Sequence, residues 1–98
     1  MMPRKIKYDQ DAWEFLMHLN SMAGSGYGPV VKKIQAIAKN PAIRGSVQID
    51  FSFKLSNDGT NTMLFTQCRY VEVMDFTITY TWSDENNNEV IITEIYDD

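Results

Sequence analysis

Two polar side chains in the second half of the chain could act on a phosphate or a nucleobase. Lys54 is one of the polar residues in the alternating run SVQIDFSFKL, where its ammonium group could contact a phosphate. Tyr96 closes the run EVIITEIY, where its ring could stack on a base and its hydroxyl group could transfer a proton. Each residue also has a simpler explanation, a solvated lysine and a packed tyrosine with its hydroxyl group in water. Both interpretations stay open at this point.

Other residues that often do chemistry are better explained without a site. His18 follows Asp11 and Glu14 along the polar side of a predicted helix, which favours an exposed ion pair. Cys68 is the one cysteine, so it forms no internal disulfide or cysteine-based metal site, and we expect it to be buried. The run GSGYG (24–28) lacks the lysine of a phosphate-binding loop and is predicted to be a flexible connector. We therefore expect no metal and no cofactor.

Charge is divided unevenly along the 98 residues. Residues 1–44 sum to +4, and residues 45–98 sum to −8. This division reflects either solvated faces or a molecule with one basic and one acidic side, and it disfavours nucleic-acid binding through the second half. The length and a hydrophobic fraction of 44% predict one domain over 1–98. No apolar run approaches the roughly 18 residues of a membrane span, and we expect a cytoplasmic protein without a signal peptide.

Helical spacing of apolar residues predicts two helices, over 11–22 and 30–39. A capping box of Asp11 and Glu14 would begin the first helix. Pro29 suits the start of the second helix, and Asn40-Pro41 would end it. A short strand in RKIKYD precedes this helical hairpin.

From Ser46 onward the apolar period changes to two, which predicts strands up to Tyr96. A change of phase near Met74-Asp75 predicts a tight turn, and EVIITEIY is apolar enough on both faces to be an interior strand. The predicted architecture is α+β, with a helical hairpin packed on a mainly antiparallel sheet of four to five strands. The predicted core comprises Leu16, Leu19, Ile34, Ile37, Ile49, Phe51, Phe53, Ile78 and Tyr80.

This order of elements resembles the RelE/ParE superfamily of bacterial toxin–antitoxin toxins. The resemblance rests on a first helix with Ala12 and Leu16, a second helix that ends in Asn40-Pro41, and the closing run VEVMDFTITYTWSDENNNEVIITEIY. That run is similar to the family pattern of a strand, a tight turn, an aromatic-rich strand, a polar turn and a final apolar strand. The resemblance covers nearly the whole chain and implies the family's fold.

The RelE branch of this family cuts messenger RNA on the ribosome with the adjacent 2′-hydroxyl group as nucleophile. Such a reaction needs cations against the developing phosphorane charge and a group that moves protons. Arg69 lies near the family's basic strand positions, although a cross-strand ion pair would also explain it. With Lys54 and Tyr96 it completes the set of candidate catalytic residues.

Two departures from the family pattern remove positive charge. The family usually places an arginine after the aromatic residue that follows the turn, but here Thr77 follows Phe76. The family also usually has a basic residue after the last strand, where this chain has Asp97 and Asp98. The resemblance therefore implies a ribosome-associated messenger RNA endonuclease whose activity is weak or absent.

Three functions remain open. The first is a toxin held inactive by an antitoxin and directed at the ribosome or at DNA gyrase, the target of the ParE branch. The second is a non-catalytic protein-binding module or nucleic-acid mimic from a phage or mobile element, which the acidic second half favours. The third is an unrelated α+β protein that shares only the pattern. Candidate partner-binding residues are Thr77, Thr79 and Thr81, which also fit a plain exposed sheet face, with Asp97 and Asp98.

Overall fold

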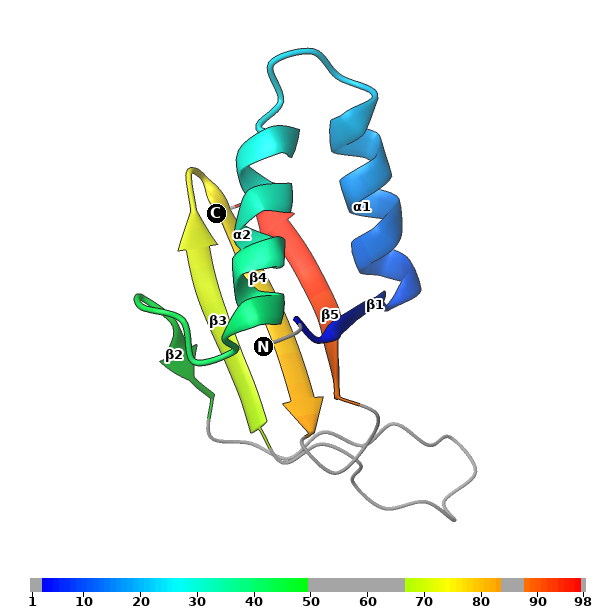
Figure 1. The fold of residues 1–98 in the computed structure, drawn as a ribbon. Coiled ribbons are helices and arrows are strands. Elements are labelled where there is room, and N and C mark those ends of the chain that lie inside the picture. Colours follow the sequence, from blue (N-terminus) through cyan, green and yellow to red (C-terminus); the bar gives the residue numbers. More distant parts are fainter. Residues whose placement is uncertain (1–2, 50–66, 84–87, 98) are drawn as a thin grey trace.

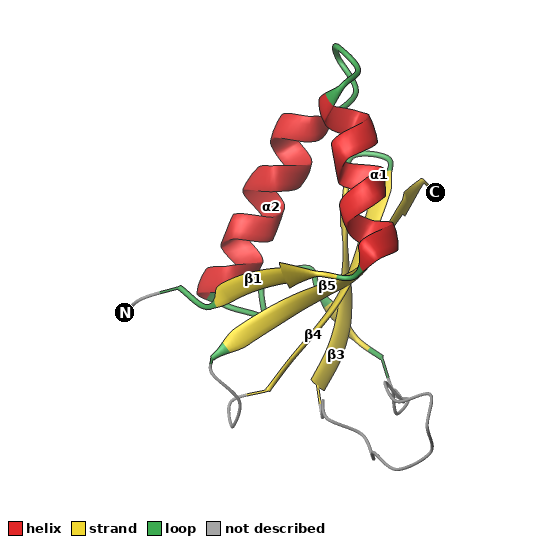
Figure 2. Cartoon of the chain, turned by 90° about the vertical axis from the view of Figure 1, so that its right-hand side faces the viewer, coloured by secondary structure: helices red, strands yellow, loops and turns green. Residues whose placement is uncertain are grey.

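A computed structural model describes residues 3–49, 67–83 and 88–97 of the chain. The elements are β1 (Lys5–Tyr8), α1 (Gln10–Asn20), α2 (Tyr27–Lys39), β2 (Val47–Gln48), β3 (Gln67–Val73), β4 (Phe76–Ser83) and β5 (Glu89–Asp97). The strands form one sheet in the order β1-β5-β4-β3-β2, and both helices lie on one face of it (Figures 1 and 2). β1 runs parallel to β5, and the other pairs are antiparallel. The predicted α+β architecture is confirmed.

The core fills the space between the two helices and the sheet. Apolar residues at helical spacing supply one side, because they fall on one stripe of α1 and one stripe of α2. Alternate residues of β4 supply the other side. Six predicted core residues are buried there, namely Leu16, Leu19, Ile34, Ile37, Ile78 and Tyr80. Phe51 and Phe53 lie outside the described residues.

The prediction for Ile49 was wrong. Ile49 is only half-buried and is not part of the core under the helices. Val47 pairs with Tyr70 of β3, whose own partner on β4 is Thr79. This register places Val47, and by alternation Ile49, on the sheet face away from the helices. The apolar side of this segment therefore belongs to the helix-free face, and Val47 is exposed there.

Two predictions about the later strands are confirmed. β3 and β4 form a hairpin in which Val73 pairs with Phe76, so Met74 and Asp75 make the tight turn. Met74 has a φ of 55°, as hairpin turns of this length require of at least one residue. β5 lies between β1 and β4 in the interior of the sheet. It carries buried residues on consecutive positions, with a register shift opposite Thr79 and Tyr80.

The ends of the helices differ in part from the prediction. α1 begins after Asp9, so the predicted capping box at Asp11 does not form, and Glu14 instead accepts a hydrogen bond from Gln10 Nε2 at 3.1 Å. α2 begins at Tyr27 and includes Pro29 in its first turn, where no backbone N–H is needed. It ends before Asn40-Pro41, as predicted. Neither described helix has the length and hydropathy to cross a membrane.

Candidate functional site

The structure does not bring the candidate catalytic residues together. Arg69 pairs with Tyr80, a core residue, and therefore lies on the helix side of the sheet. Tyr96 pairs with Thr77 near the other end of β4 and lies on the helix-free face. Lys54 lies outside the described residues. A phosphate held by Arg69 could not at the same time contact Tyr96, so these two residues do not share one catalytic centre. The catalytic roles themselves stay predictions.

Arg69 joins a polar cluster that holds the segment after α2 against the sheet. Its Nη1 donates hydrogen bonds to Ser46 Oγ at 3.1 Å and to the Ser46 backbone oxygen at 3.3 Å. The hydroxyl group of Tyr80, which is fully buried, donates to the Pro41 backbone oxygen. Burial raises the pKa of Tyr80, while its contact with Ser46 and the charge of Arg69 act to lower it. This cluster explains Arg69 as a structural residue with Ser46 as its partner, in place of the predicted cross-strand ion pair.

The threonine row on β4 lies on the helix-free face, but it is not exposed. Thr77, Thr79 and Thr81 are 5%, 8% and 1% exposed, so the interpretation as a plain exposed sheet face was wrong. Cross-strand neighbours narrow the access to these side chains, because Tyr70 and Tyr96 pair with Thr79 and Thr77. A partner on this face would meet Tyr96, which is 45% exposed, before it met a threonine. The role of the row in partner binding stays a prediction.

The helix-free face carries both acidic and basic side chains where the structure describes it. Glu72 of β3 and Glu94 of β5 are exposed on this face, and Glu89 forms an ion pair with Lys7 of β1 at 3.1 Å. The described residues of β3, β4 and β5 place no lysine or arginine on this face, since Arg69 points to the other side. At the edge of the sheet, Lys5 and Lys7 of β1 do lie on it. The part of this face around Glu72 and Glu94 therefore repels a phosphate and attracts a basic partner.

The end of β5 is also acidic, but on the helix side of the sheet. Asp97 is exposed and pairs with Phe76, at the end of the sheet that also holds the β3–β4 turn. Asp98 lies outside the described residues. Thr77, at the family's arginine position, is buried. The described part of the chain therefore offers a phosphate neither of the two cations that the family pattern would place here.

Two features were missed by the sequence interpretation. The cluster of Ser46, Arg69 and Tyr80 brings together residues far apart in the chain, and no local pattern indicates it. The outer side of α2 is basic and hollowed, with Lys32 and Lys33 among its residues. The absence of acidic residues from Tyr27–Lys39 could have indicated that basic side. Within the described ranges, no group of three or more His, Cys, Asp or Glu residues could hold a metal ion.

Comparison with known proteins gives a match in structure but none in sequence. No protein-family model matches the chain, and no curated protein matches it. The fold is similar to a chain in the crystal structure of the archaeal RelE–RelB complex from Pyrococcus horikoshii OT3, with a TM-score of 0.67 and 10% sequence identity. The match covers 98% of this chain and 96% of the archaeal one. At such low identity the likeness concerns the fold, which here extends over almost the whole of both chains. The protein therefore has a RelE-like fold.

Proposed function

We propose that this protein is the toxin component of a toxin–antitoxin system, inhibited by an antitoxin and deficient in messenger RNA cleavage. The observation that carries the proposal is the likeness in fold to a chain of a RelE–RelB complex. Because the match covers 98% of this chain, the likeness concerns the arrangement of all its described elements and not one shared motif. The antitoxin is the partner proposed by analogy with RelB.

The missing ribonuclease cations support the second half of the proposal. Thr77 is buried, Asp97 is acidic, and the described residues of β3, β4 and β5 place glutamates but no cation on the helix-free face. One lost charge-stabilising donor raises a reaction barrier by about 2.7–4 kcal/mol. Two such losses would slow cleavage by roughly four to six orders of magnitude if they were additive. DNA gyrase, which the ParE branch inhibits without those residues, therefore fits better as a target than messenger RNA does. Both targets are cytoplasmic, which is where we propose that the protein acts.

A purified system separates the two targets. The protein is added to ribosomes programmed with messenger RNA, and separately to DNA gyrase in a supercoiling assay. We expect little or no cleavage of the messenger RNA. Codon-dependent cutting at a rate typical of RelE would show that the deficiency proposed from Thr77 and Asp97 is wrong, while the proposed toxin role would stand. Inhibition of supercoiling would assign the gyrase target.

The acidic surface favours a second candidate, a non-catalytic binding module that imitates nucleic acid. Glu72 and Glu94 are exposed on the helix-free face, and carboxylates on a sheet can present charge as a phosphate backbone does. Asp97 adds an exposed carboxylate on the other face. Such a protein would bind the nucleic-acid site of its target without stopping bacterial growth by itself. Controlled induction in bacteria distinguishes the two, because a toxin should stop growth.

A further inference from the structure

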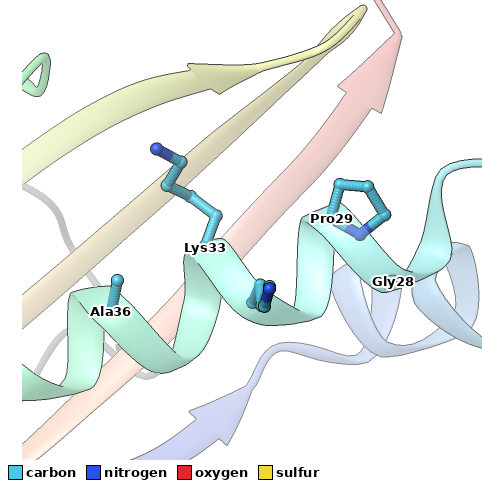
Figure 3. A pocket seen from close by; sticks show the side chains of 5 residues that line it. Gly28, Pro29, Lys33 and Ala36 are labelled. Carbon is cyan, nitrogen blue, oxygen red and sulfur yellow. The ribbon is translucent and has the colours of Figure 1, made fainter.

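Two hollows lie along α2, and the larger is on the side away from the buried stripe of this helix. The larger has a volume of about 740 Å³, is open to solvent, and is lined by Gly28, Pro29, Lys32, Lys33 and Ala36. Figure 3 shows Pro29, Lys33 and Ala36 rising from the same side of the helix. The smaller hollow has a volume of about 310 Å³, and its lining residues are Pro3, Arg4, Ile6, Gln35, Ala38 and Lys39. Gln35 and Ala36 are neighbours in sequence and therefore point to different sides of α2, so the smaller hollow lies beside the larger one, toward β1.

The charges around these hollows have one sign. Every charged residue that lines them is a cation, namely Arg4, Lys32, Lys33 and Lys39. α2 contains no aspartate or glutamate. In the part of the chain that the structure describes, no carboxylate forms an ion pair with Lys32 or Lys33. The field of this side therefore favours an anionic partner.

The lining also restricts what kind of anion fits. Glycine, proline, alanine and the methylene stems of the two lysines make the larger hollow apolar between its charged groups. Single-stranded nucleic acid binds through stacked bases as well as phosphates, and no aromatic residue is among those that line either hollow. A polypeptide that carries both apolar and acidic side chains satisfies both properties of the surface. The volume of the larger hollow, within the range of about 300–1,000 Å³ typical of ligand sites, accommodates several side chains.

We propose that the outer side of α2 docks an acidic, amphipathic segment of a partner protein. The carboxylates of that segment meet Lys32 and Lys33, and its apolar side chains cover Pro29 and Ala36. Gly28 and Lys39 lie about 17 Å apart along the helix axis at a rise of 1.5 Å per residue, so a helix of about 12 residues matches α2 in length and covers the larger hollow. The inference goes beyond the proposed function, because it requires no toxic activity and holds for any partner with this chemistry.

The test uses the full-length protein and two synthetic peptides of about 12 residues, the length set by α2. The peptides share the same leucine and alanine positions at helical spacing, but one carries glutamate and the other lysine at the remaining positions. Binding is followed through the backbone amide signals of isotope-labelled protein in NMR spectra. We expect the acidic peptide to shift the signals of residues 28–39, with an affinity that falls as salt is added. The lysine peptide should leave these signals unchanged.

A matched pair of variants shows whether the two lysines are responsible. The double variant Lys32→Glu/Lys33→Glu should weaken binding of the acidic peptide by about tenfold or more, the equivalent of two or more exposed ion pairs. Lys5→Glu/Lys7→Glu is the control, because both lysines are exposed on the helix-free face of β1 and this variant makes the same change in net charge. It should bind the acidic peptide as the native protein does.

Several results would overturn the proposal. They are an acidic peptide that shifts no α2 signal, equal responses to both peptides, equal losses in Lys5→Glu/Lys7→Glu and Lys32→Glu/Lys33→Glu, and tighter binding of a uridine oligonucleotide to the same residues. Shifts of the α2 signals when the protein alone is concentrated would identify a second copy as the occupant and would also overturn it. None of these measurements depends on toxicity, so the inference and the proposed function can fail independently.

Discussion

Gly26, in the loop between the two helices, lies close to Phe76 and Met74 of the β3–β4 hairpin. Its replacement by alanine should therefore lower the free energy of unfolding. Its φ is 94°, in the left-handed region that side chains with a Cβ avoid at a cost of roughly 1–2 kcal/mol. A Cβ atom placed there would lie 2.9 Å from Cε2 of Phe76, closer than real Cβ contacts come. Phe76 is 8% exposed, and its ring packs edge-on against the ring of Phe15, with 6.0 Å between the ring centroids. The Phe76 ring therefore has little room to move. Overpacking of this kind costs about 1–3 kcal/mol.

The expected loss for Gly26→Ala is therefore about 2–5 kcal/mol of the free energy of unfolding. Two other glycines separate the contributions. Gly24 has a φ of 72°, and a Cβ atom there would meet no atom within 4 Å, so Gly24→Ala should cost only the backbone strain, about 1–2 kcal/mol. Gly28 lies in α2 with neither a positive φ nor a close neighbour, so Gly28→Ala should stabilise the protein by up to about 1 kcal/mol.

Urea unfolding followed by circular dichroism measures all three variants. Equal losses for Gly26→Ala and Gly24→Ala would refute the contact with Phe76. No loss for Gly26→Ala would also refute the backbone conformation. Combining Gly26→Ala with Phe76→Leu provides a further check, because the smaller side chain should recover most of the contact cost, and additive losses would contradict the crowding.

Three further predictions concern the polar cluster and the acidic end of the sheet. Ser46→Ala should lower the free energy of unfolding by about 0.5–1.5 kcal/mol, since Arg69 Nη1 loses its bond to the hydroxyl oxygen, and a loss below the error of urea unfolding would contradict that role. Burial raises the pKa of Tyr80, so above about pH 10 the unfolded chain releases this proton first and stability falls with pH by up to about 1.4 kcal/mol per unit. Tyr80→Phe should be less stable at neutral pH, but its stability should fall less steeply as the pH rises above about 10. An unchanged slope of stability against pH would contradict this reasoning. Asp97→Lys and Asp98→Lys should weaken binding to a basic partner more than Asp97→Asn and Asp98→Asn do, and the difference should be smaller at high salt. If the affinity for the partner depends on neither charge nor salt, these two residues take no part in binding.

Patterns that act over a few residues predicted the architecture well. The apolar stripes of α1 and α2 and the period-two run of β4 decide which side chains face each other, and the core containing Leu16, Ile34 and Tyr80 follows from them. The change of phase between Val73 and Phe76 likewise requires a turn, wherever the hairpin lies in the sheet. Such features depend on local spacing, which the sequence displays directly.

Features set by pairing between distant segments were harder to predict. The alternation around Ile49 shows that one side of the segment is apolar but not which face of the sheet receives it, and the register with β3 decides this. The burial of Thr79 also depends on neighbours from other strands, since Tyr70 and Glu94 pair with it. For the candidate site, the sequence supplied residue types, whereas the strand register shows that Arg69 and Tyr96 lie on opposite faces.

Growth of bacteria after controlled induction tests the proposed toxin role most directly. The native chain is compared with Ile34→Asp, which places an unpaired carboxylate at a core position that is 1% exposed and should prevent folding. Both are expressed from the same tightly regulated promoter, and the amount of each protein is measured alongside the growth curve. Growth should stop after induction of the native chain and continue with Ile34→Asp. Unimpaired growth while the native chain accumulates in folded form would contradict the toxin role.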